Sequence, residues 1–226
     1  SGKAWDDMVW VDQGPPPGSP QGALVPAFLI DRNEVTNAQF LKFVAADGYR
    51  NKSYWPESML LQGRATPWSS AVQRFIDRTG LPGPRFWSNG RYPEGKEDHP
   101  VAGVSWYEAS AYARWAGKDL PSGEQWWRAA LGETRSAFPW GNDVKTTELR
   151  ANFGLVSTRP VGSYPLGISP FGCFDMAGNV REWLRDASPG AVRRIVVGGS
   201  WQDPAYMFEP EHKEAFLQEK TAALAG

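Results

Sequence analysis

The chain contains few residues whose type and spacing could support catalysis. It has one cysteine, Cys173, and two histidines, His99 and His212. A three-histidine iron centre cannot be built from two histidines, and a site of two histidines and a carboxylate would need both to converge. We expect His99, which precedes Pro100, to be a hydrogen-bonded loop residue and His212 to be solvated in a charged tail. A single cysteine excludes an intramolecular disulfide, and we expect Cys173 to be buried and inert.

Other candidate nucleophiles and acids lack the context that their chemistry needs. Ser200 follows two glycines but is not in a Gly-x-Ser-x-Gly turn, and no histidine is placed to activate it. The pairs Glu97 with Asp98 and Glu209 with Glu211 show neither the burial nor the separation of a glycosidase pair. We therefore expect Ser200 to serve the fold or a binding surface, and these acids to be solvated.

The composition indicates one globular domain over residues 1–226. The chain is 41% hydrophobic, which is enough for one substantial core, and its 12 Trp are interleaved with 24 Gly and 19 Pro. This mixture predicts a loop-rich fold with an aromatic core. The net charge of −1, without a run of Lys or Arg, argues against nucleic acid and anionic membranes as partners. Because no stretch of about eighteen apolar residues and no signal-peptide apolar segment is visible, we expect a cytoplasmic location.

Three helices are predicted by capping boxes, in which a Ser or Thr hydroxyl accepts from the N–H three residues on and a Glu or Gln reaches back. The pairs are Thr36 with Gln39, Ser105 with Glu108, and Ser122 with Gln125. Glycines predict where these helices end: Gly48, Gly117 and Gly132. A shorter helix is expected over 71–79, inside a long Pro- and Gly-marked stretch from 49 to 100. Strands are expected over 8–11, 27–30, 158–164 and 194–197.

Two segments carry the strongest family signal. Residues 174–183 read Phe-Asp-Met-Ala-Gly-Asn-Val-Arg-Glu-Trp, and residues 198–201 read Gly-Gly-Ser-Trp. Shorter segments precede them in a fixed order: Ile30-Asp31-Arg32-Asn33-Glu34-Val35-Thr36-Asn37 with Phe40, His99-Pro100-Val101, Val104-Ser105-Trp106, Ala111-Tyr112-Ala113, Trp115-Ala116-Gly117-Lys118, Leu120-Pro121-Ser122, Phe138-Pro139-Trp140-Gly141 and Pro160-Val161-Gly162-Ser163-Tyr164. Together they make the chain resemble the formylglycine-generating enzyme (sulfatase-modifying factor) family over nearly its whole length. The resemblance implies an α+β, C-type-lectin-like fold with little regular secondary structure.

The long stretch between the first two boxed helices resembles a subgroup found beside bacterial serine/threonine kinases and other signalling modules. It contains Gly48-Tyr49, Tyr54-Trp55, Thr79-Gly80-Leu81-Pro82-Gly83-Pro84 and Tyr92-Pro93-Glu94-Gly95. The implied partner is a fused or neighbouring kinase or signalling module. The chain itself has neither a kinase glycine-rich loop with its downstream Lys nor a catalytic His-Arg-Asp segment.

The resemblance places two substitutions at the catalytic positions of the family. Aerobic formylglycine-generating enzymes bind copper through two cysteines that follow Gly-Gly-Ser, and they oxidise a substrate cysteine. Here those positions hold Asp203 and Phe208. A carboxylate with a phenyl ring cannot replace a thiolate pair as the ligands of soft Cu(I). We therefore expect no copper and no iron, and a domain that is not an oxidase of this kind.

The resemblance also implies a structural calcium ion. Family positions that supply side-chain oxygens and backbone carbonyls are matched by Asp175, Gly178, Val180 and Glu182. Such a mixture of oxygens in a glycine-containing loop is what calcium requires. The alternative is a salt-bridged turn without metal. A second family site, at Asn152 and Phe153, lacks its full acidic segment here, so we expect at most one ion.

Relatives such as retroelement-diversified variable proteins bind ligands with the surface that follows Gly-Gly-Ser-Trp. The matching ligand-binding residues here are Ser200, Trp201, Gln202, Asp203 and Tyr206. Large amphipathic side chains with polar atoms are typical of interface hot spots. We expect Asp203 and Tyr206 to be exposed, whereas Trp201, Met207 and Phe208 could equally be core residues.

The sequence thus predicts a non-catalytic ligand- or protein-binding, sensory domain linked to bacterial signalling. The alternatives are a divergent oxidoreductase of the same family that acts on a peptide or small molecule, and a structural accessory to an enzyme. Family members close with a Gly-Phe-Arg strand, which is missing before Gly226, and the chain starts without Met. We therefore expect a piece of a longer protein that lacks its closing strand, whose absence would expose a sheet edge.

Overall fold

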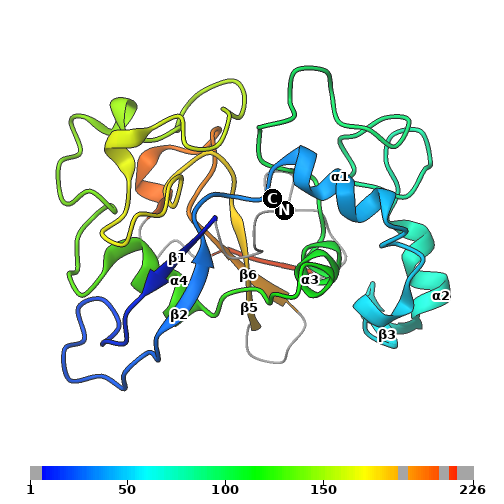
Figure 1. Ribbon diagram of the computed structural model, residues 1–226, viewed down its shortest axis with the longest axis horizontal. Coiled ribbons are helices and arrows are strands. Elements are labelled where there is room, and N and C mark those ends of the chain that lie inside the picture. The colour runs from blue at the N-terminus through cyan, green and yellow to red at the C-terminus, as the bar shows by residue number, and fades with distance from the viewer. Residues whose placement is uncertain (1–6, 188–192, 209–213, 218–226) are drawn as a thin grey trace.

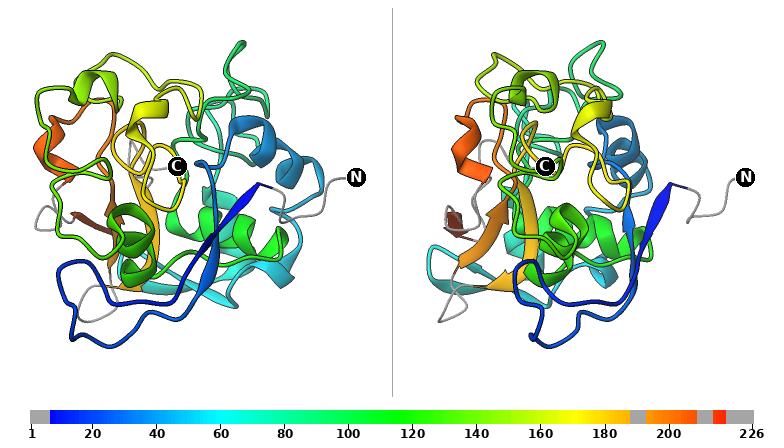
Figure 2. Two further views of the ribbon diagram at one scale, coloured as in Figure 1. Left: turned by 60° about the vertical axis from the view of Figure 1, so that its left-hand side comes forward. Right: turned by 90° about the vertical axis from the view of Figure 1, so that its left-hand side faces the viewer.

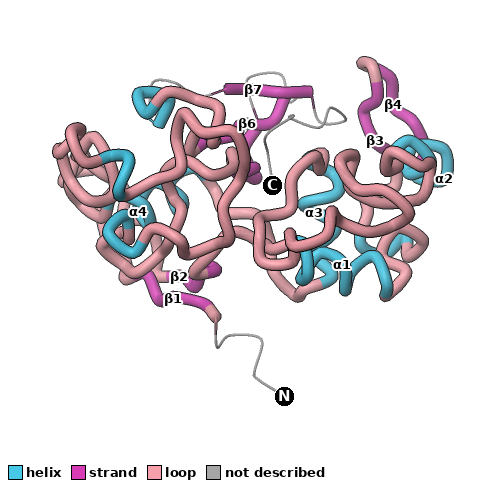
Figure 3. Tube along the Cα trace, turned by 90° about the horizontal axis from the view of Figure 1, so that it is seen from above, coloured by secondary structure: helices cyan, strands magenta, loops and turns pink. Residues whose placement is uncertain are grey.

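The computed structural model describes residues 7–187, 193–208 and 214–217. Its helices and 3-10 turns are α1 (Asn37–Ala45), η1 (Lys52–Tyr54), α2 (Trp68–Ala71), η2 (Val72–Arg74), α3 (Trp106–Trp115), α4 (Gly123–Leu131), η3 (Thr147–Leu149), η4 (Pro165–Gly167) and η5 (Ala205–Phe208). Its strands are β1 (Met8–Val11), β2 (Phe28–Asp31), β3 (Ser58–Leu61), β4 (Arg64–Pro67), β5 (Glu182–Ala187), β6 (Arg193–Val197) and β7 (Glu214–Leu217). Short elements joined by long loops dominate the molecule (Figure 3), as the predicted α+β fold requires.

The three predicted capping boxes are confirmed. Thr36, Ser105 and Ser122 each accept from the backbone N–H three residues on, while the Gln or Glu at that position accepts from the cap's own N–H. These paired bonds satisfy two N–H groups that a helix start otherwise leaves without partners. α4 ends at Gly132 as predicted, and the positive φ of 67° there suits glycine. The caps therefore fix where α1, α3 and α4 begin.

Two local predictions are wrong. Residues 158–164 do not form a strand, because the chain turns at 160–163, where the N–H of Ser163 donates to the carbonyl of Pro160. The helix predicted at 71–79 lies earlier, as α2 and η2, and ends before Phe75. Beyond it the buried carboxylate of Asp77 accepts from the backbone N–H groups of Thr79 and Gly90, which holds that segment in a turn.

Strand β5 lies between two hydrophobic cores. Trp183 packs into one core with α1 and α3, and its neighbour Leu184 packs into the other core with α4 and β1. On β6, Val196 and Val197 divide in the same way. Because successive side chains of a strand point to opposite faces, the sheet is buried on both sides. The two cores therefore lie against opposite faces of the same sheet.

The two cores occupy the two halves of the molecule in Figure 1, where α4, β1 and β2 lie on the left and α1, α2 and β3 on the right. The sheets are small and separate. Among the described residues, β1 pairs with β2 and β3 with β4, while β5, β6 and β7 form an antiparallel sheet in that order. None of the described helices has the length and apolar character to cross a membrane.

Candidate functional site

The segment that follows Gly-Gly-Ser is held by a buried carboxylate. Oδ2 of Asp203 accepts from both the backbone N–H and the hydroxyl of Ser200, each at 2.7 Å, and its Oδ1 lies 2.8 Å from Nη2 of Arg181. Ser200 is fully buried and Asp203 nearly so. The expectation that Asp203 would be exposed is therefore wrong, because its charge is used inside the turn. Both side chains are buried, which argues against their predicted place on a ligand-binding surface.

Phe208 is a core residue. Its ring is 1% exposed and lies 5.4 Å from that of Trp127, 5.7 Å from Phe138 and 6.2 Å from Trp126, measured between centroids. An aromatic ring in such a cluster contributes large apolar contact to the fold. The sequence left open whether Phe208 belongs to the core or to a binding surface, and the structure shows that it belongs to the core.

An exposed surface remains on the outer side of this turn. Gln202 and Tyr206 are exposed, Tyr206 by 56%, and Trp201 is partly buried. The exposure expected for Tyr206 is thus confirmed. The neighbouring loop adds Leu155 and the 99% exposed Val156, because the N–H of Leu155 donates to the carbonyl of Trp201 at 2.7 Å. We call Trp201, Gln202, Tyr206, Leu155 and Val156 the recognition surface; η5, which carries Tyr206, lies at the edge of the molecule in both views of Figure 2.

The loop with the predicted metal ligands lies directly behind the recognition surface. Gly178 N–H donates to the carbonyl of Gly198 at 2.8 Å, and Trp201 N–H donates to that of Asn179 at 2.9 Å. Gly178 has a φ of 83°, and a Cβ there would lie 2.7 Å from the carbonyl oxygen of Asn152. Only glycine fits this approach. A change in the shape of this loop would therefore be passed to Trp201 through hydrogen bonds.

Three carboxylates gather at this loop. Burial raises the pKa of Asp175 to about 6 and that of Glu182 to about 7, and the charges of Asp175 and Asp31 add to the effect on Glu182. Burial also raises the pKa of Glu34 well above its ordinary value, and repulsion from Asp175 and Glu182 adds to it. Glu34 accepts from the N–H of Val180 and from the amide of Asn179. Burial therefore disfavours the ionised form of all three carboxyl groups, and none of them has an ion pair with a described residue.

The oxygens around this loop suit a hard cation. The carbonyl oxygens of Gly178 and Val180 accept no hydrogen bond from described residues. Nearby, Oδ1 of Asn152 is buried and has no partner in that part of the chain either. Two carboxylates and two free carbonyls are the kinds of ligand that calcium prefers. Across the described residues, however, no three His, Cys, Asp or Glu side chains are arranged to hold a metal by themselves, so backbone oxygens would have to complete the site.

Cys173 and His99, the remaining candidate nucleophile and base, are both buried. Cys173 is fully buried, as predicted, and burial raises the pKa of its thiol to about 12. His99 is buried in its loop, where Nδ1 lies 2.8 Å from Oγ1 of Thr158 and Nε2 lies 3.5 Å from Nζ of Lys96. Burial and the charge of Lys96 lower its pKa, which keeps the imidazole neutral. His212 lies outside the described residues.

The sequence reasoning missed Glu34 and the pair Leu155 and Val156. The signal for Glu34 was weak, because its segment also contains Asp31 and Arg32, and a carboxylate among charged residues is usually solvated. For Leu155 and Val156 there was no signal, since a short apolar pair between polar residues looks the same whether it is buried or exposed. Only the hydrogen bonds to Trp201 and Asp203 place that loop beside the recognition surface.

These features define a class of protein: a loop-rich α+β domain in which an acidic loop is hydrogen-bonded to a Gly-Gly-Ser-Trp turn. Residues 4–226 match the family model described as the sulfatase-modifying factor enzyme 1-like domain. The chain belongs to this family, as the resemblance predicted.

Its relatives differ in what they do. The chain is 35% identical over 217 residues to the hercynine oxygenase of Mycobacterium tuberculosis, an alignment that covers 81% of this chain and 48% of that protein. It is 34% identical to the serine/threonine-protein kinase Pkn1 of Chlamydia trachomatis, over 79% of this chain and 29% of that kinase. The corresponding kinase of Chlamydia caviae is 35% identical, over 78% of this chain and 28% of its own length. The chain is 35% identical to the formylglycine-generating enzyme of M. tuberculosis, over 70% of this chain and 63% of that enzyme. The chain spans about half the length of the hercynine oxygenases it matches.

Solved structures support the fold. PvdO from Pseudomonas aeruginosa superposes with a TM-score of 0.66 at 20% identity and covers all of this chain and 95% of its own. Treponema denticola variable protein 1 superposes with a TM-score of 0.64 at 16% identity, covering 97% of this chain and 92% of its own. At these identities the likeness establishes the α+β fold of the family and nothing about activity.

Proposed function

We propose that this domain is a non-catalytic binding module, which recognises a ligand through the recognition surface and serves a bacterial signalling protein. The proposal rests mainly on the structural roles of Asp203 and Phe208. Asp203 is engaged by Ser200 and Arg181, and Phe208 fills an aromatic core. By the family resemblance these positions hold the copper-binding cysteines of the oxidases, and here both are committed to holding the fold. The Pkn1 kinases among the relatives support the signalling context.

The recognition surface has the chemistry of a binding site. Tyr206 is exposed and combines a large apolar area with a hydroxyl, while the partly buried Trp201, whose indole nitrogen is buried, and Leu155 and Val156 add apolar contact on the same side. Exposed aromatic side chains beside apolar ones are typical of residues that dominate interface energies. Because Ser200 and Asp203 hold the turn from behind, the surface is already ordered before a ligand arrives.

We further propose that calcium, held by Asp175 and Glu182 with the carbonyls of Gly178 and Val180, stabilises this surface from behind. When bound, the ion would neutralise the buried carboxylates and fix the loop. The bond from Gly178 to Gly198 and the bond from Trp201 to Asn179 then connect the ion to the surface. Magnesium is a poorer fit, because it demands near-ideal octahedral geometry and keeps several waters.

The test is a quantitative pull-down from the lysate of the source cells, with Tyr206→Ala and Trp201→Ala compared with the wild-type domain. Trp10→Ala on β1 is the matched control, since Trp10 is 57% exposed against 56% for Tyr206. A partner lost with Trp201→Ala and Tyr206→Ala but kept with Trp10→Ala supports the proposal. A partner lost with all three, or kept with all three, contradicts it. Repeating the capture in chelator measures the contribution of calcium.

A divergent oxidoreductase is the second candidate. It is favoured by the 35% identity to a hercynine oxygenase over 81% of this chain. It predicts oxygen uptake when a cysteine-containing peptide or a small-molecule thiol is added, and copper or iron that copurifies with the protein. The binding-module proposal predicts neither, so an oxygen electrode and metal analysis of the same sample separate the two.

A further inference from the structure

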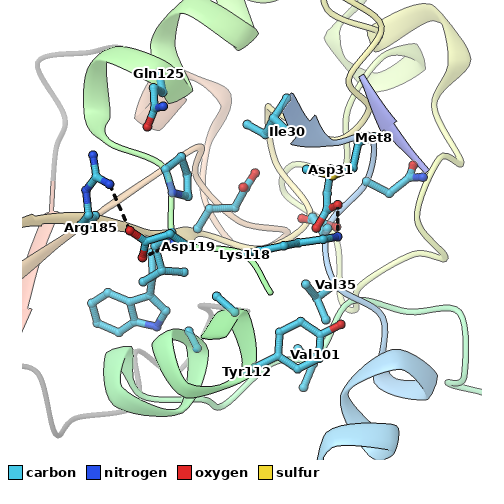
Figure 4. A pocket seen from close by; sticks show the side chains of 18 of the residues that line it. Met8, Ile30, Asp31, Val35, Val101, Tyr112, Lys118, Asp119, Gln125 and Arg185 are labelled. Atoms are coloured by element: carbon cyan, nitrogen blue, oxygen red, sulfur yellow. Dashed lines mark hydrogen bonds and ion pairs between the residues drawn. The ribbon is translucent and has the colours of Figure 1, made fainter. Parts of the chain in front are cut away.

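We propose that the cavity between α3, β2 and β5 binds an uncharged small molecule of about two fused rings, whose hydroxyl group is held by Tyr112 and Asp31. The cavity has a volume of about 330 Å³, and no residue of the recognition surface lines it. Figure 4 shows it with Tyr112 and Val35 on one side and Ile30 and Asp31 on another. The proposed site is therefore separate from the surface to which we assign the binding function.

The volume determines the size of the ligand. A cavity of about 150 Å³ lined by apolar side chains is large enough for one benzene ring, and this cavity is roughly twice as large. It also falls in the range of about 300–1,000 Å³ that is typical of binding pockets. A molecule of two fused rings therefore matches the space.

The cavity lies between the two hydrophobic cores. Val101 and Ala109 of the core around α1 and α3 line it, as does Met176 of the core around α4 and β1. Phe28 and Ile30 of β2, which pack against the second core, form a further part of the wall. Burial of apolar surface is the main favourable contribution in such an enclosure, so we expect the body of the ligand to be apolar.

The exposed ends of the cavity contain charged residues that neutralise one another. Asp31 pairs with Lys118 at 2.5 Å, and Asp119 pairs with Arg185 at 3.0 Å. Figure 4 shows both pairs, with Lys118 extended toward Asp31 across the view. A charged ligand would lose its hydration here without gaining an unpaired partner of opposite charge, which is unfavourable in an apolar enclosure. The ligand is therefore uncharged.

Two glutamates also line the cavity, but neither provides a free charge for a ligand. Both oxygens of Glu34 accept hydrogen bonds, one from the amide of Asn179 and the other from the N–H of Val180. Glu182 is a ligand of the proposed calcium ion. The small-molecule site therefore depends on neither glutamate.

The hydroxyl of Tyr112 is the polar group that α3 contributes to the cavity. The ring of Tyr112 stacks on Phe40, with centroids 5.2 Å apart, and makes an edge contact with Phe43 at 6.0 Å, so its position is fixed. Its hydroxyl makes no hydrogen bond to a described residue, and Figure 4 shows it pointing away from α3. Burial and the charge of Asp31 raise the pKa of Tyr112 to about 12, so these two groups lie in the same part of the cavity.

Tyr112 and Asp31 together are complementary to a hydroxyl group. Oδ1 of Asp31 accepts from Lys118, whereas Oδ2 accepts no hydrogen bond from a described residue. A hydroxyl has one donor and two acceptor positions. A ligand hydroxyl can therefore donate to Oδ2 of Asp31 and accept from the hydroxyl of Tyr112, which stays protonated at neutral pH.

The direct test uses 2-naphthol, which has two fused rings and a hydroxyl and is uncharged near neutral pH. It is titrated by calorimetry into the domain in a chelator, so that calcium at Glu182 does not affect the result. We expect saturable binding. The same rings with a charge, as in 2-naphthoate and 2-naphthylmethylammonium, should bind about tenfold more weakly or worse, because the charge loses its hydration without a partner.

Variants of the protein give an independent check, after a urea titration has shown that each is folded. Tyr112→Phe removes the hydroxyl and should weaken the binding of 2-naphthol about two- to tenfold. Tyr54→Phe is its control, because Tyr54 also packs on Phe43 but does not line the cavity. Ala113→Met fills part of the cavity and should abolish binding, whereas Ala65→Met, at an exposed position of β4, should leave it unchanged.

Four results would overturn the proposal. The first two are no binding of 2-naphthol and equal affinity for 2-naphthol and either charged analogue. Unchanged affinity in Tyr112→Phe would show that the assigned hydroxyl does not hold the ligand. Unchanged affinity in a folded Ala113→Met variant would place 2-naphthol elsewhere on the protein.

Discussion

The turn from Ser200 to Asp203 allows a sharp prediction about stability. Replacing Asp203 by Ala removes two acceptor contacts to Ser200 at 2.7 Å and the contact to Arg181 at 2.8 Å. The side chains of Asp203 and Arg181 are 12% and 13% exposed, so this is a buried pair. Breaking such a pair by removing one partner costs about 3–5 kcal/mol. We expect a loss near the lower end, about 3 kcal/mol, because the arginine keeps some access to water.

The matched control is Asp119→Ala, which breaks the 3.0 Å pair with Arg185. Those side chains are 52% and 56% exposed, and an exposed pair contributes about 0.2–1 kcal/mol. Both variants are measured by urea titration, and the slope m should stay constant so that the midpoint reports stability. In thermal unfolding the Asp203 variant should melt roughly 6–12 °C below the wild type, at about 2–4 °C per kcal/mol for a domain of this size.

One outcome would refute the reasoning. If Asp203→Ala and Asp119→Ala lower the free energy of unfolding by the same amount, the Ser200 turn is not held by its carboxylate. The recognition surface would then lack the ordered support that the proposed function assigns to it. Ser200→Ala tests the same turn more gently and should cost about 1 kcal/mol, because it removes one hydroxyl bond and leaves the backbone bond in place.

Four further outcomes follow from the structure. Phe208→Ala should lower the free energy of unfolding by about 3–5 kcal/mol in urea, whereas Tyr206→Ala should change it by less than about 0.5 kcal/mol; equal losses would mean that Phe208 is not in the core. Calcium should raise the melting temperature of the wild type and not of Asp175→Ala, and an equal rise in both would contradict the assigned ligands. Burial raises the pKa of Glu108 from its ordinary value of 4.5 to about 7, so the folded state keeps this proton to a higher pH than the unfolded state does. The contribution of protonated Glu108 to stability is therefore complete below pH 4.5 and is lost as the pH rises through 7. In Glu108→Gln the decline of stability over that interval should be shallower, and an unchanged slope would exclude Glu108 as a cause. Finally, the thiol of Cys173 should react with a disulfide reagent only in denaturant, and rapid labelling of the native protein would show that it is not buried.

The sequence predicted the features that are encoded locally. Each capping box needs only residues three positions apart, so the helices that begin after Thr36, Ser105 and Ser122 could be predicted without tertiary information. The hairpin β3–β4 was missed although its turn, Gln62-Gly63, has positive φ at both residues, 50° and 76°. Gln is an uncommon residue at such a position, where Asn or Asp is the usual signal. The family motifs, rather than any periodicity, carried the fold prediction.

The site was harder to predict because its residues depend on long-range contacts. Asp203 is polar and follows a predicted surface turn, yet it is buried because Arg181, 22 positions earlier, provides its partner. Burial of a charge is decided by the partner and not by the residue type. In the same way, Glu34 meets the 175–182 loop across 145 positions of sequence. Neither contact could be read from spacing, and both determine which side chains remain for a ligand.

The burial of Phe208 also has a consequence for any attempt to place copper ligands in this chain. At this position the oxidases of the family, by resemblance, have a cysteine, and a cysteine here would remove a ring that touches three other aromatic rings. The cavity left behind would destabilise the domain before any second cysteine could bind metal. Introducing a thiolate pair here therefore requires compensating changes in the core first. The aromatic cluster therefore ties the stability of the domain to a side chain that cannot ligate copper.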